Sequence, residues 1–278
     1  MCDLFAAERL KEKLENYKKA KSVYFANQDD DRADINKIFD DLMNIAPQLR
    51  PLMTNVSLDL MNHIKAGKSI LFEGAQGAML DIDLGTYPFL TSSNTTVGGA
   101  LTGLGLGPKV FDEIIGVVKA YTTRVGAGPF PTELTDEKAA VLRETGGEFG
   151  ATTGRPRRVG WLDMVALRHA CRINGVEKIA ITKLDVLDNL EKIKVCEAYR
   201  LDGEEINEVP LDLWDLCRVT PVYREFKGWK EPTAGIDSFE NLPAGARDYI
   251  NYISANLGAE ICLISTGARR EETIMAQS

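Results

Sequence analysis

The stretch WLDMVALRHACRINGVEKIAITKLD, residues 161–185, decides the fold class of this chain. Residues 161–173 predict a helix, and this helix leads to a strand predicted at residues 178–182. The centre of the strand, Ile179-Ala180-Ile181, is apolar, and Lys183 and Asp185 follow at its end. Strands that alternate with helices in this way indicate an α/β sheet with a substantial parallel component.

The same alternation extends in both directions from this stretch. Toward the N-terminus we expect helices at residues 3–24, 33–46, 55–66 and 109–120, and strands at residues 69–73 and 121–125. Toward the C-terminus we expect a β-rich region around Gly203, a helix at residues 243–257 and a strand at residues 259–264. These elements predict an α/β fold with a mixed, largely parallel central sheet flanked by helices.

The predicted elements also suggest a division of the chain. Residues 1–67 form a helical segment in this prediction, and residues 68–278 form the α/β core. A small β-rich insertion is expected within the core, near residues 196–230.

Composition excludes several classes of protein. The 278 residues are 44% hydrophobic with a net charge of -8, which suits a soluble globular chain and disfavours a general nucleic-acid binder. The five cysteines are far apart and form no C-x-x-C pair, and only His63 and His169 supply imidazoles, so we expect no metal site. No export signal or membrane-spanning stretch is evident, so we expect a cytoplasmic protein without a membrane partner.

Residues 151–158, ATTGRPRR, concentrate three arginines in an acidic chain. Guanidinium groups bind carboxylates and phosphates through paired donors. Gly154 permits a tight turn, and Pro156 restricts the backbone between the arginines. These features favour a stiff loop for a small, multiply anionic ligand. A solvated basic turn is the alternative.

Three other motifs are weaker than they first look. Gly67-Lys68-Ser69 resembles the end of a phosphate-binding loop, but Asn62 stands where the first glycine would be, and a strand rather than a helix is predicted to follow. The glycines between residues 98 and 107 do not spell a dinucleotide fingerprint. The run Asp29-Asp30-Asp31 fits a polar turn better than a metal site, because consecutive residues converge poorly on one ion.

Polar turns follow two apolar strands of the predicted sheet. Lys183-Leu184-Asp185 follows Ile179–Ile181, and Ser265-Thr266-Gly267 follows the strand at residues 261–264. Ligands of α/β proteins lie at such strand ends. An aspartate there can accept hydrogen bonds from both the ring N–H and the exocyclic amine of guanine, whereas adenine would leave the carboxylate poorly paired. The alternative is that each turn is an ordinary surface turn.

Two further segments could contact a ligand. Gln76 lies in FEGAQG, and its amide can both donate and accept hydrogen bonds. Residues 91–96, TSSNTT, supply five hydroxyls in six positions and would suit a phosphate. Each segment also fits an ordinary turn stabilised by local hydrogen bonds.

Seven segments, taken in order, resemble the adenylosuccinate synthetase family: FEGAQG, DIDLGTYPF, TSSNTT, TRVGAGPFPTE, EFGATTGRPRRVGWLD, TKLDVLD and ISTG. The resemblance runs from about Ile70 to the C-terminus and, more loosely, through the first 69 residues. It implies a P-loop-NTPase-like fold and a nucleotide-binding role for the core. It also implies that GTP phosphorylates the 6-oxygen of IMP and that L-aspartate then displaces the phosphate.

The resemblance assigns roles to individual residues. Gln76 resembles the amide at the reacting 6-position of IMP and would support catalysis, and Thr91 resembles the hydroxyl that holds the IMP 5′-phosphate. Residues Ala151, Thr152, Thr153, Gly154, Arg155, Pro156 and Arg157 resemble the loop that captures aspartate. Within that loop, Arg155 would also reach the IMP ribose and Arg157 the GTP side. The guanine pocket would consist of Lys183, Leu184, Asp185, Ser265, Thr266 and Gly267.

The family pattern also begins with a first strand, a phosphate loop that carries an aspartate and a lysine, and later a catalytic histidine. None of these has a counterpart in the 278 residues, and the missing aspartate is the main Mg²⁺ ligand of the complete enzyme. We therefore expect little ligase turnover from this chain alone. The family's shared active site implies a homodimer.

Two alternatives stay open from the residues alone. The chain could be a non-catalytic guanine-nucleotide-binding or assembly module on the same scaffold. It could also be a sugar-phosphate enzyme that uses the arginine loop for a different acid. A preference for guanine nucleotides would distinguish the binding module from the sugar-phosphate enzyme. Measured turnover would distinguish an enzyme from a binding module.

Overall fold

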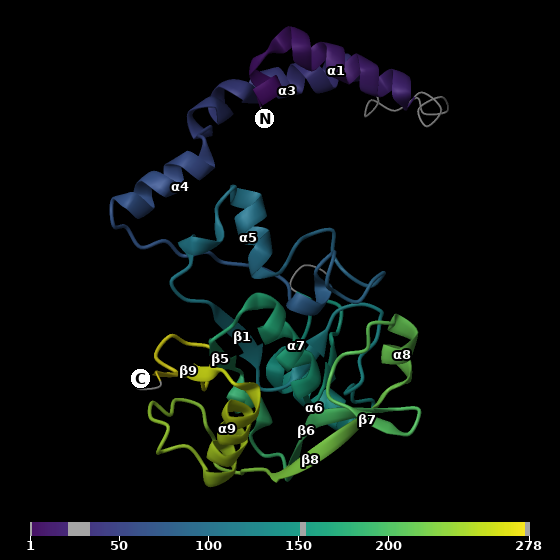
Figure 1. The fold of residues 1–278 in the computed structure, drawn as a ribbon, viewed down its shortest axis with the longest axis vertical. Coiled ribbons are helices and arrows are strands. Elements are labelled where there is room, and N and C mark those ends of the chain that lie inside the picture. Colours follow the sequence, from purple (N-terminus) through teal and green to yellow (C-terminus); the bar gives the residue numbers. More distant parts are fainter. Residues whose placement is uncertain (1, 22–33, 151–153, 276–278) are drawn as a thin grey trace. The chain divides into compact units, whose positions relative to one another are not determined.

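A computed structural model describes residues 2–21, 34–150 and 154–275 of the chain (Figure 1). It divides into two compact units, Met1–Ser69 and Ile70–Ser278. No helix within the described ranges combines the length and the apolar character needed to cross a lipid bilayer.

Helices make up most of the described part of the first unit. Its main helices are α1 (Ala7–Ala20), α3 (Ile35–Leu49) and α4 (Val56–Lys65). Side chains cap two of them: Asp34 accepts from the backbone of α3, and Asn55 accepts from Leu58 N of α4 at 3.2 Å. The sequence predicted that the second helix ends before Pro47, whereas α3 continues through this proline to Leu49.

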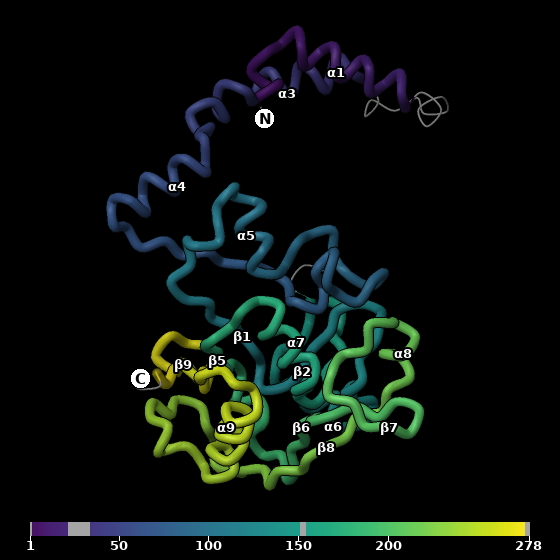
Figure 2. Tube along the Cα trace, in the orientation of Figure 1, coloured from purple at the N-terminus to yellow at the C-terminus, as the bar shows by residue number. Residues whose placement is uncertain are grey.

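The main sheet of the second unit consists of β1 (Ile115–Lys119), β5 (Lys178–Thr182), β9 (Glu260–Ser265) and β10 (Thr273–Met275), in that order. The first three strands are parallel, and β10 is antiparallel to β9. Figure 2 shows β5 between β1 and β9. Because β5 is the apolar strand in the middle of the parallel set, Ile179 and Ile181 are fully buried.

A second sheet consists of β4 (Leu162–Asp163), β6 (Lys192–Leu201), β7 (Glu204–Ile206) and β8 (Thr220–Lys227). Helix α7 (Met164–Asn174) packs against β6 and against α9 (Ala244–Leu257). Asp163 caps α7 through Val165 N and Ala166 N, and its other oxygen accepts from Tyr199 OH at 2.6 Å. This fully buried tyrosine therefore connects the start of α7 to β6.

The remaining elements lie around these sheets. They are the short pair β2 (Thr122–Arg124) and β3 (Arg158–Gly160), and the helices α5 (Val97–Leu104), α6 (Glu137–Gly146) and α8 (Leu213–Arg218). The mixed, largely parallel sheet flanked by helices agrees with the predicted fold class.

Two of the secondary-structure predictions made from the sequence were wrong. Residues 109–120 do not form a helix: a 3₁₀ turn at Pro108–Val110 is followed by β1, whose Val117 and Val118 favour a strand paired with β5. Residues 69–73 are not a strand, because no described strand pairs with them and a strand without a partner leaves its backbone groups unsatisfied. Phe72 instead stacks edge-on against Phe111, with ring centroids 5.1 Å apart.

Candidate functional site

The two polar turns predicted from the sequence lie at the same edge of the sheet. Strands β5 and β9 are adjacent and parallel, and Ile181 is in register with Ile264. The turns that follow them, Lys183–Asp185 and Ser265–Gly267, are therefore neighbours. This edge holds the carboxyl ends of all three parallel strands, where α/β proteins bind ligands.

The first turn is held by an unusual backbone conformation. Lys183 has a φ of 59°, a left-handed value that costs a side chain such as lysine free energy. Its Nζ donates to the carbonyl of Gly146, at the end of α6, with a distance of 2.7 Å. Leu184 is fully buried beneath the turn. The turn is thus anchored by the two residues that precede Asp185.

The carboxylate of Asp185 has few hydrogen-bond partners within the described residues. Burial raises the pKa of its carboxyl above the ordinary value, and the nearby Asp188 raises it further. In the described part of the chain the carboxylate accepts only from its own backbone N–H. Asp188, by contrast, accepts from Trp229 Nε1, Thr233 N and Thr233 Oγ1 at 2.6, 2.8 and 2.9 Å. Of the two carboxylates, Asp185 is the one with capacity left for a ligand.

The second turn is closed by its own residues. Ser265 Oγ donates to the carbonyl of Gly267 at 2.7 Å. Thr266 is fully buried, its hydroxyl donates to the Ile236 carbonyl at 3.1 Å, and its N–H donates to the Glu272 carbonyl at 2.9 Å. A Cβ at Gly267 would lie 2.3 Å from Glu272 Oε2, so the Glu272 carboxylate would have to move to admit a side chain there. Thr266 therefore supports the turn from inside.

The arginine loop begins and ends on a short antiparallel bridge between Phe149 and Pro156. Gly150 N donates to the Arg155 carbonyl at 2.8 Å, and Gly154 N donates to the Gly150 carbonyl at 2.8 Å. Gly154 has a φ of 63°, which explains the glycine at this position. Ala151, Thr152 and Thr153 lie outside the described residues.

A buried glutamate at the base of this loop escaped the sequence analysis. Glu148 has a side-chain exposure of 0%, and its Oε1 accepts from Lys119 Nζ at 2.7 Å and from Tyr121 OH at 2.6 Å. Its Oε2 accepts from Arg157 Nη1 at 2.7 Å. Burial alone would raise the pKa of Glu148, but the hydrogen bonds from these three partners outweigh burial and lower it.

No local signal could have identified Glu148. Lys119 lies 29 positions earlier in the chain and Tyr121 27 positions earlier, so only the fold brings them to the glutamate. Lys119 is the last residue of β1, next to the end of β5. The Glu148 cluster, defined here as Lys119, Tyr121, Glu148 and Arg157, therefore joins the arginine loop to the strand ends.

The hydroxyl-rich segment is organised around a second buried carboxylate. Asp81 is 1% exposed and accepts from the backbone N–H groups of Asp83, Leu84, Thr95 and Thr96. Thr91 lies in the loop between these groups, and its Oγ1 accepts from Ser93 N at 3.2 Å. Thr95 Oγ1 donates to the Gly77 carbonyl at 2.8 Å, which joins this segment to the turn that carries Gln76.

Gln76 is exposed and has a φ of 65°. Two of the four described non-glycine residues with left-handed backbones, Gln76 and Lys183, are thus residues that the sequence analysis assigned to the site. Such backbone strain is concentrated at functional sites in proteins.

Arg124 and Arg158 hold the segments around the arginine loop in place. Arg124 Nη2 donates to Thr86 Oγ1 and to the Phe89 carbonyl, at 3.0 and 2.8 Å. Arg158 forms a two-point ion pair with Glu133 and donates to the Gly128 carbonyl at 2.9 Å. Arg124 and Arg158 are in register on the paired strands β2 and β3, so this pair connects the segment before Thr91 to the end of the arginine loop.

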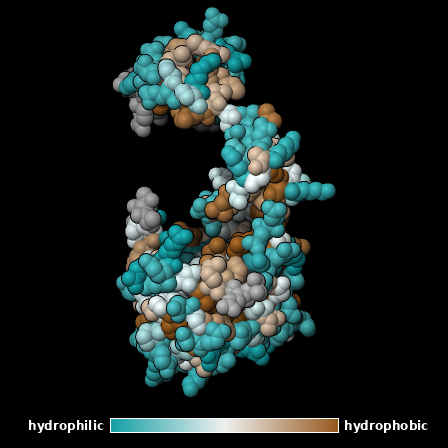
Figure 3. All heavy atoms as spheres, turned by 90° about the vertical axis from the view of Figure 1, so that its left-hand side faces the viewer, coloured by the Kyte–Doolittle hydropathy of each residue, from teal (hydrophilic) through white to brown (hydrophobic). Residues whose placement is uncertain are grey.

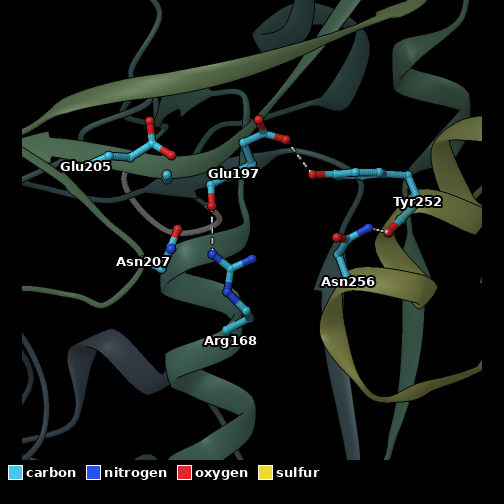
Figure 4. A pocket seen from close by; sticks show the side chains of 7 residues that line it. Arg168, Glu197, Glu205, Asn207, Tyr252 and Asn256 are labelled. Atoms are coloured by element: carbon cyan, nitrogen blue, oxygen red, sulfur yellow. Dashed lines mark hydrogen bonds between the residues drawn. The ribbon is translucent and has the colours of Figure 1, made fainter.

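A hollow of about 320 Å³ lies away from these residues, between α7, β6 and α9 (Figure 4). Three of the residues that line it, Arg168, Glu197 and Tyr252, are joined by hydrogen bonds. Tyr252 OH donates to Glu197 Oε2 at 2.8 Å, Arg168 donates to the Glu197 carbonyl at 2.7 Å, and Arg224 Nε lies 3.6 Å from the Glu197 carboxylate.

Within the described ranges, no three His, Cys, Asp or Glu side chains come together in a way that could hold a metal ion.

A family model described as adenylosuccinate synthetase matches residues 1–274. The adenylosuccinate synthetase of Caldanaerobacter subterraneus is 48% identical over 279 residues, which cover 100% of this chain and 65% of the relative. That of Hahella chejuensis is 54% identical over 242 residues, which cover 87% of this chain and 56% of the relative. The chain thus spans less than two thirds of the length of these curated relatives.

Two solved structures also match this chain. The structure of fully ligated adenylosuccinate synthetase from Plasmodium falciparum matches with a TM-score of 0.90 at 38% identity, over 98% of this chain and 64% of that one. A cyanophage S-2L succinoaminodeoxyadenylate synthetase, solved with dGMP and dATP, matches with a TM-score of 0.50 at 17% identity, over 80% of this chain and 50% of that one. The second match shows a shared fold only.

Proposed function

The chain belongs to the adenylosuccinate synthetase family, and on this premise we propose that it carries the ligand-binding part of a GTP-dependent ligase that joins IMP and L-aspartate. The product would be adenylosuccinate, a precursor of AMP. In this proposal GTP is a co-substrate, and Mg²⁺ accompanies it in the complete enzyme. No residue of this chain is assigned as a metal ligand.

One observation carries the proposal: Asp185 is a half-buried carboxylate without a side-chain donor, and it belongs to one of two adjacent, anchored turns. Guanine offers two adjacent donors, the ring N1–H and the exocyclic amine, which would satisfy both carboxylate oxygens. Adenine offers an acceptor at N1 and would leave the carboxylate partly unpaired in a desolvated pocket. The proposed pocket consists of Lys183, Leu184, Asp185, Ser265, Thr266 and Gly267.

The arginine loop would supply the positive charge for the other substrates. Residues 151–157 are proposed to capture the carboxylates of aspartate, with Arg155 also contacting the IMP ribose and Arg157 contacting GTP. Thr91 would hold the IMP 5′-phosphate, and Gln76 would contact the 6-position that reacts. The hydrogen bonds that join the Gln76 turn to the Thr91 segment support a common ligand for the two.

Calorimetric titration of the 278-residue chain with GTP and with ATP tests the guanine pocket. We expect GTP to bind about a hundredfold or more tightly than ATP, because two charge-assisted hydrogen bonds distinguish the bases. Asp185→Asn should abolish most of this preference. The matched control is Asp248→Asn, which neutralises an exposed aspartate on α9 and should leave the preference intact. An unchanged preference in Asp185→Asn would remove this contact from the proposal.

An assay with IMP, aspartate, GTP and Mg²⁺ that detects adenylosuccinate measures turnover directly. We propose that this polypeptide assayed alone binds nucleotide with little turnover, as the resemblance implies. Guanine-selective binding without any product would also fit a non-catalytic binding module. A homodimer is a further part of the proposal, and the mass in solution with and without IMP tests it.

A further inference from the structure

The Glu148 cluster has a charge balance that points toward a ligand. Glu148 is fully buried, and its two oxygens take hydrogen bonds from Lys119, Tyr121 and Arg157 at 2.6–2.7 Å. Two cations face one carboxylate, so the cluster carries one net positive charge. Arg157 is the cation of the cluster that lies at the base of the arginine loop, and 29% of its side chain is exposed.

The way Glu148 holds Arg157 leaves a specific edge of the guanidinium available. Only Nη1 donates to Glu148, and neither Nε nor Nη2 makes a hydrogen bond to another residue of the described ranges. The Nε–Nη2 edge is a two-donor fork that matches a carboxylate or a phosphate. A flexible arginine would have to be ordered by its ligand at an entropic cost, whereas Glu148 orders Arg157 in advance.

We propose that Glu148 is a positioning residue that orients the Arg157 guanidinium so that its Nε–Nη2 edge receives an anionic group of the nucleotide. Glu148 touches no ligand itself and acts through Arg157. This inference rests on the proposed function for the identity of the ligand, GTP, but the ordering of Arg157 by Glu148 does not depend on it.

The position of Glu148 in the chain extends this role. Two residues before it, the Gly146 carbonyl accepts from Lys183 Nζ in the proposed guanine pocket. The turn at residues 146–148 thus holds one residue from each of two proposed ligand sites. A substitution of Glu148 should therefore disturb Arg157, which is proposed to face the nucleotide, and should leave the proposed guanine contact at Asp185 in place.

A double-mutant cycle separates positioning from a general structural role. GTP affinity is measured for the wild-type chain, Glu148→Gln, Arg157→Ala and the double variant. We expect Glu148→Gln to weaken GTP binding about tenfold to hundredfold, and Arg157→Ala to weaken it by a similar factor. Both variants should lose the charge-assisted contact between Arg157 and the nucleotide, because Glu148→Gln leaves the guanidinium unoriented and Arg157→Ala removes it. The double variant should then be no more than about threefold weaker than Arg157→Ala. Additive losses, or an unchanged affinity in Glu148→Gln, would overturn the proposal.

The neighbouring ion pair provides the matched control. Glu133→Gln breaks the pair with Arg158, the next arginine in the chain, and should change GTP affinity by no more than about threefold. The ratio of GTP to ATP affinity should also persist in Glu148→Gln, since Asp185 is untouched. If Glu148→Gln does not fold, as judged by circular dichroism, Glu148→Asp replaces it in the cycle, because it retains the charge but withdraws the carboxylate from Arg157.

A measurement without ligand keeps this inference distinguishable from the proposed function. The Nε–H signal of Arg157 in NMR spectra, assigned through its loss in Arg157→Lys, should report an ordered guanidinium in the wild type and in Glu133→Gln. It should report a mobile guanidinium in Glu148→Gln. If the wild type binds no GTP, the proposed function fails, and this signal alone decides the role of Glu148. An equally ordered signal in Glu148→Gln overturns that role.

Discussion

At the scale of single residues, the candidate site contains two kinds of carboxylate. Asp81, Asp188 and Glu148 have their oxygens occupied by donors from the protein and hold loops in place. Asp185 lacks a side-chain donor, and burial raises the pKa of its carboxyl. Burying a carboxylate without partners costs free energy unless a ligand supplies them. This contrast distinguishes Asp185, the proposed binding residue, from the carboxylates that hold loops in place.

The raised pKa of Asp185 leads to a pH-dependent prediction. Only the ionised carboxylate can accept both guanine donors, so GTP affinity should fall as the pH drops through the raised pKa, beginning above the ordinary aspartate value of about 3.9. GTP titrations between about pH 7 and pH 4.5 measure this fall. Asp185→Asn serves as the control, because it still shows the titration of the GTP phosphates. Parallel pH profiles for the two proteins would contradict the assignment.

Residue types and their spacing indicated Asp185 and the arginine loop, but they could not indicate Glu148. A lone glutamate before a loop is ordinary in sequence. Its importance comes from full burial and from partners on β1 and just after it, which are contacts at a distance of 27 and 29 positions.

At the scale of elements, helix α6 ends against the Glu148 cluster. Gly146 is its last residue, and a Cβ there would lie 2.3 Å from Tyr121 OH, which donates to Glu148. Gly103 in α5 is also helical, but a Cβ there would meet nothing within 4 Å. The two glycines therefore differ in tertiary packing although both lie in helices.

Alanine substitutions at these glycines should act in opposite directions. Gly103→Ala should raise the free energy of unfolding by about 0.5–1 kcal/mol, because alanine is the better helix former. Gly146→Ala should lower it by about 1–3 kcal/mol, because the new methyl group displaces Tyr121. Urea unfolding followed by tryptophan fluorescence measures both values. A stabilised Gly146→Ala would show that the cluster tolerates the displacement.

The error at residues 109–120 has a cause at this same scale. The segment KVFDEIIGVVKA has apolar residues that fit a helical spacing as well as a strand. The segment Ile115–Lys119 forms a strand because it pairs in parallel with β5. This pairing depends on the tertiary structure and not on the local sequence.

At the scale of the whole molecule, the two units differ in how much apolar surface they bury. In the first unit, the buried hydrophobic residues of the described part are Leu4, Ile35 and Ala46. Large apolar side chains are exposed there, and Figure 3 shows apolar atoms on the surface of this unit. They are Tyr17, Ile45, Leu52, Met53, Val56 and Leu58. The second unit holds the large core around β5, β6 and α9.

We therefore expect the first unit to unfold at a lower urea concentration than the second. All three tryptophans, Trp161, Trp214 and Trp229, lie in the second unit, whereas both units contribute helix. Ellipticity at 222 nm should thus begin to fall before tryptophan fluorescence changes, which violates two-state behaviour. Coincident transitions by the two probes would show that the units unfold together.

Local sequence alone determined the α/β class, the strand at residues 178–182, the helix that ends at Leu257 and the polar turns after two apolar strands, because periodicity and turn chemistry depend on near neighbours. Tertiary structure alone decided that those two strands are adjacent, that residues 115–119 join them as a third parallel strand and that Glu148 meets its three partners. Strand pairing and the burial of a charge depend on residues tens of positions away, and no local pattern encodes which of them will meet.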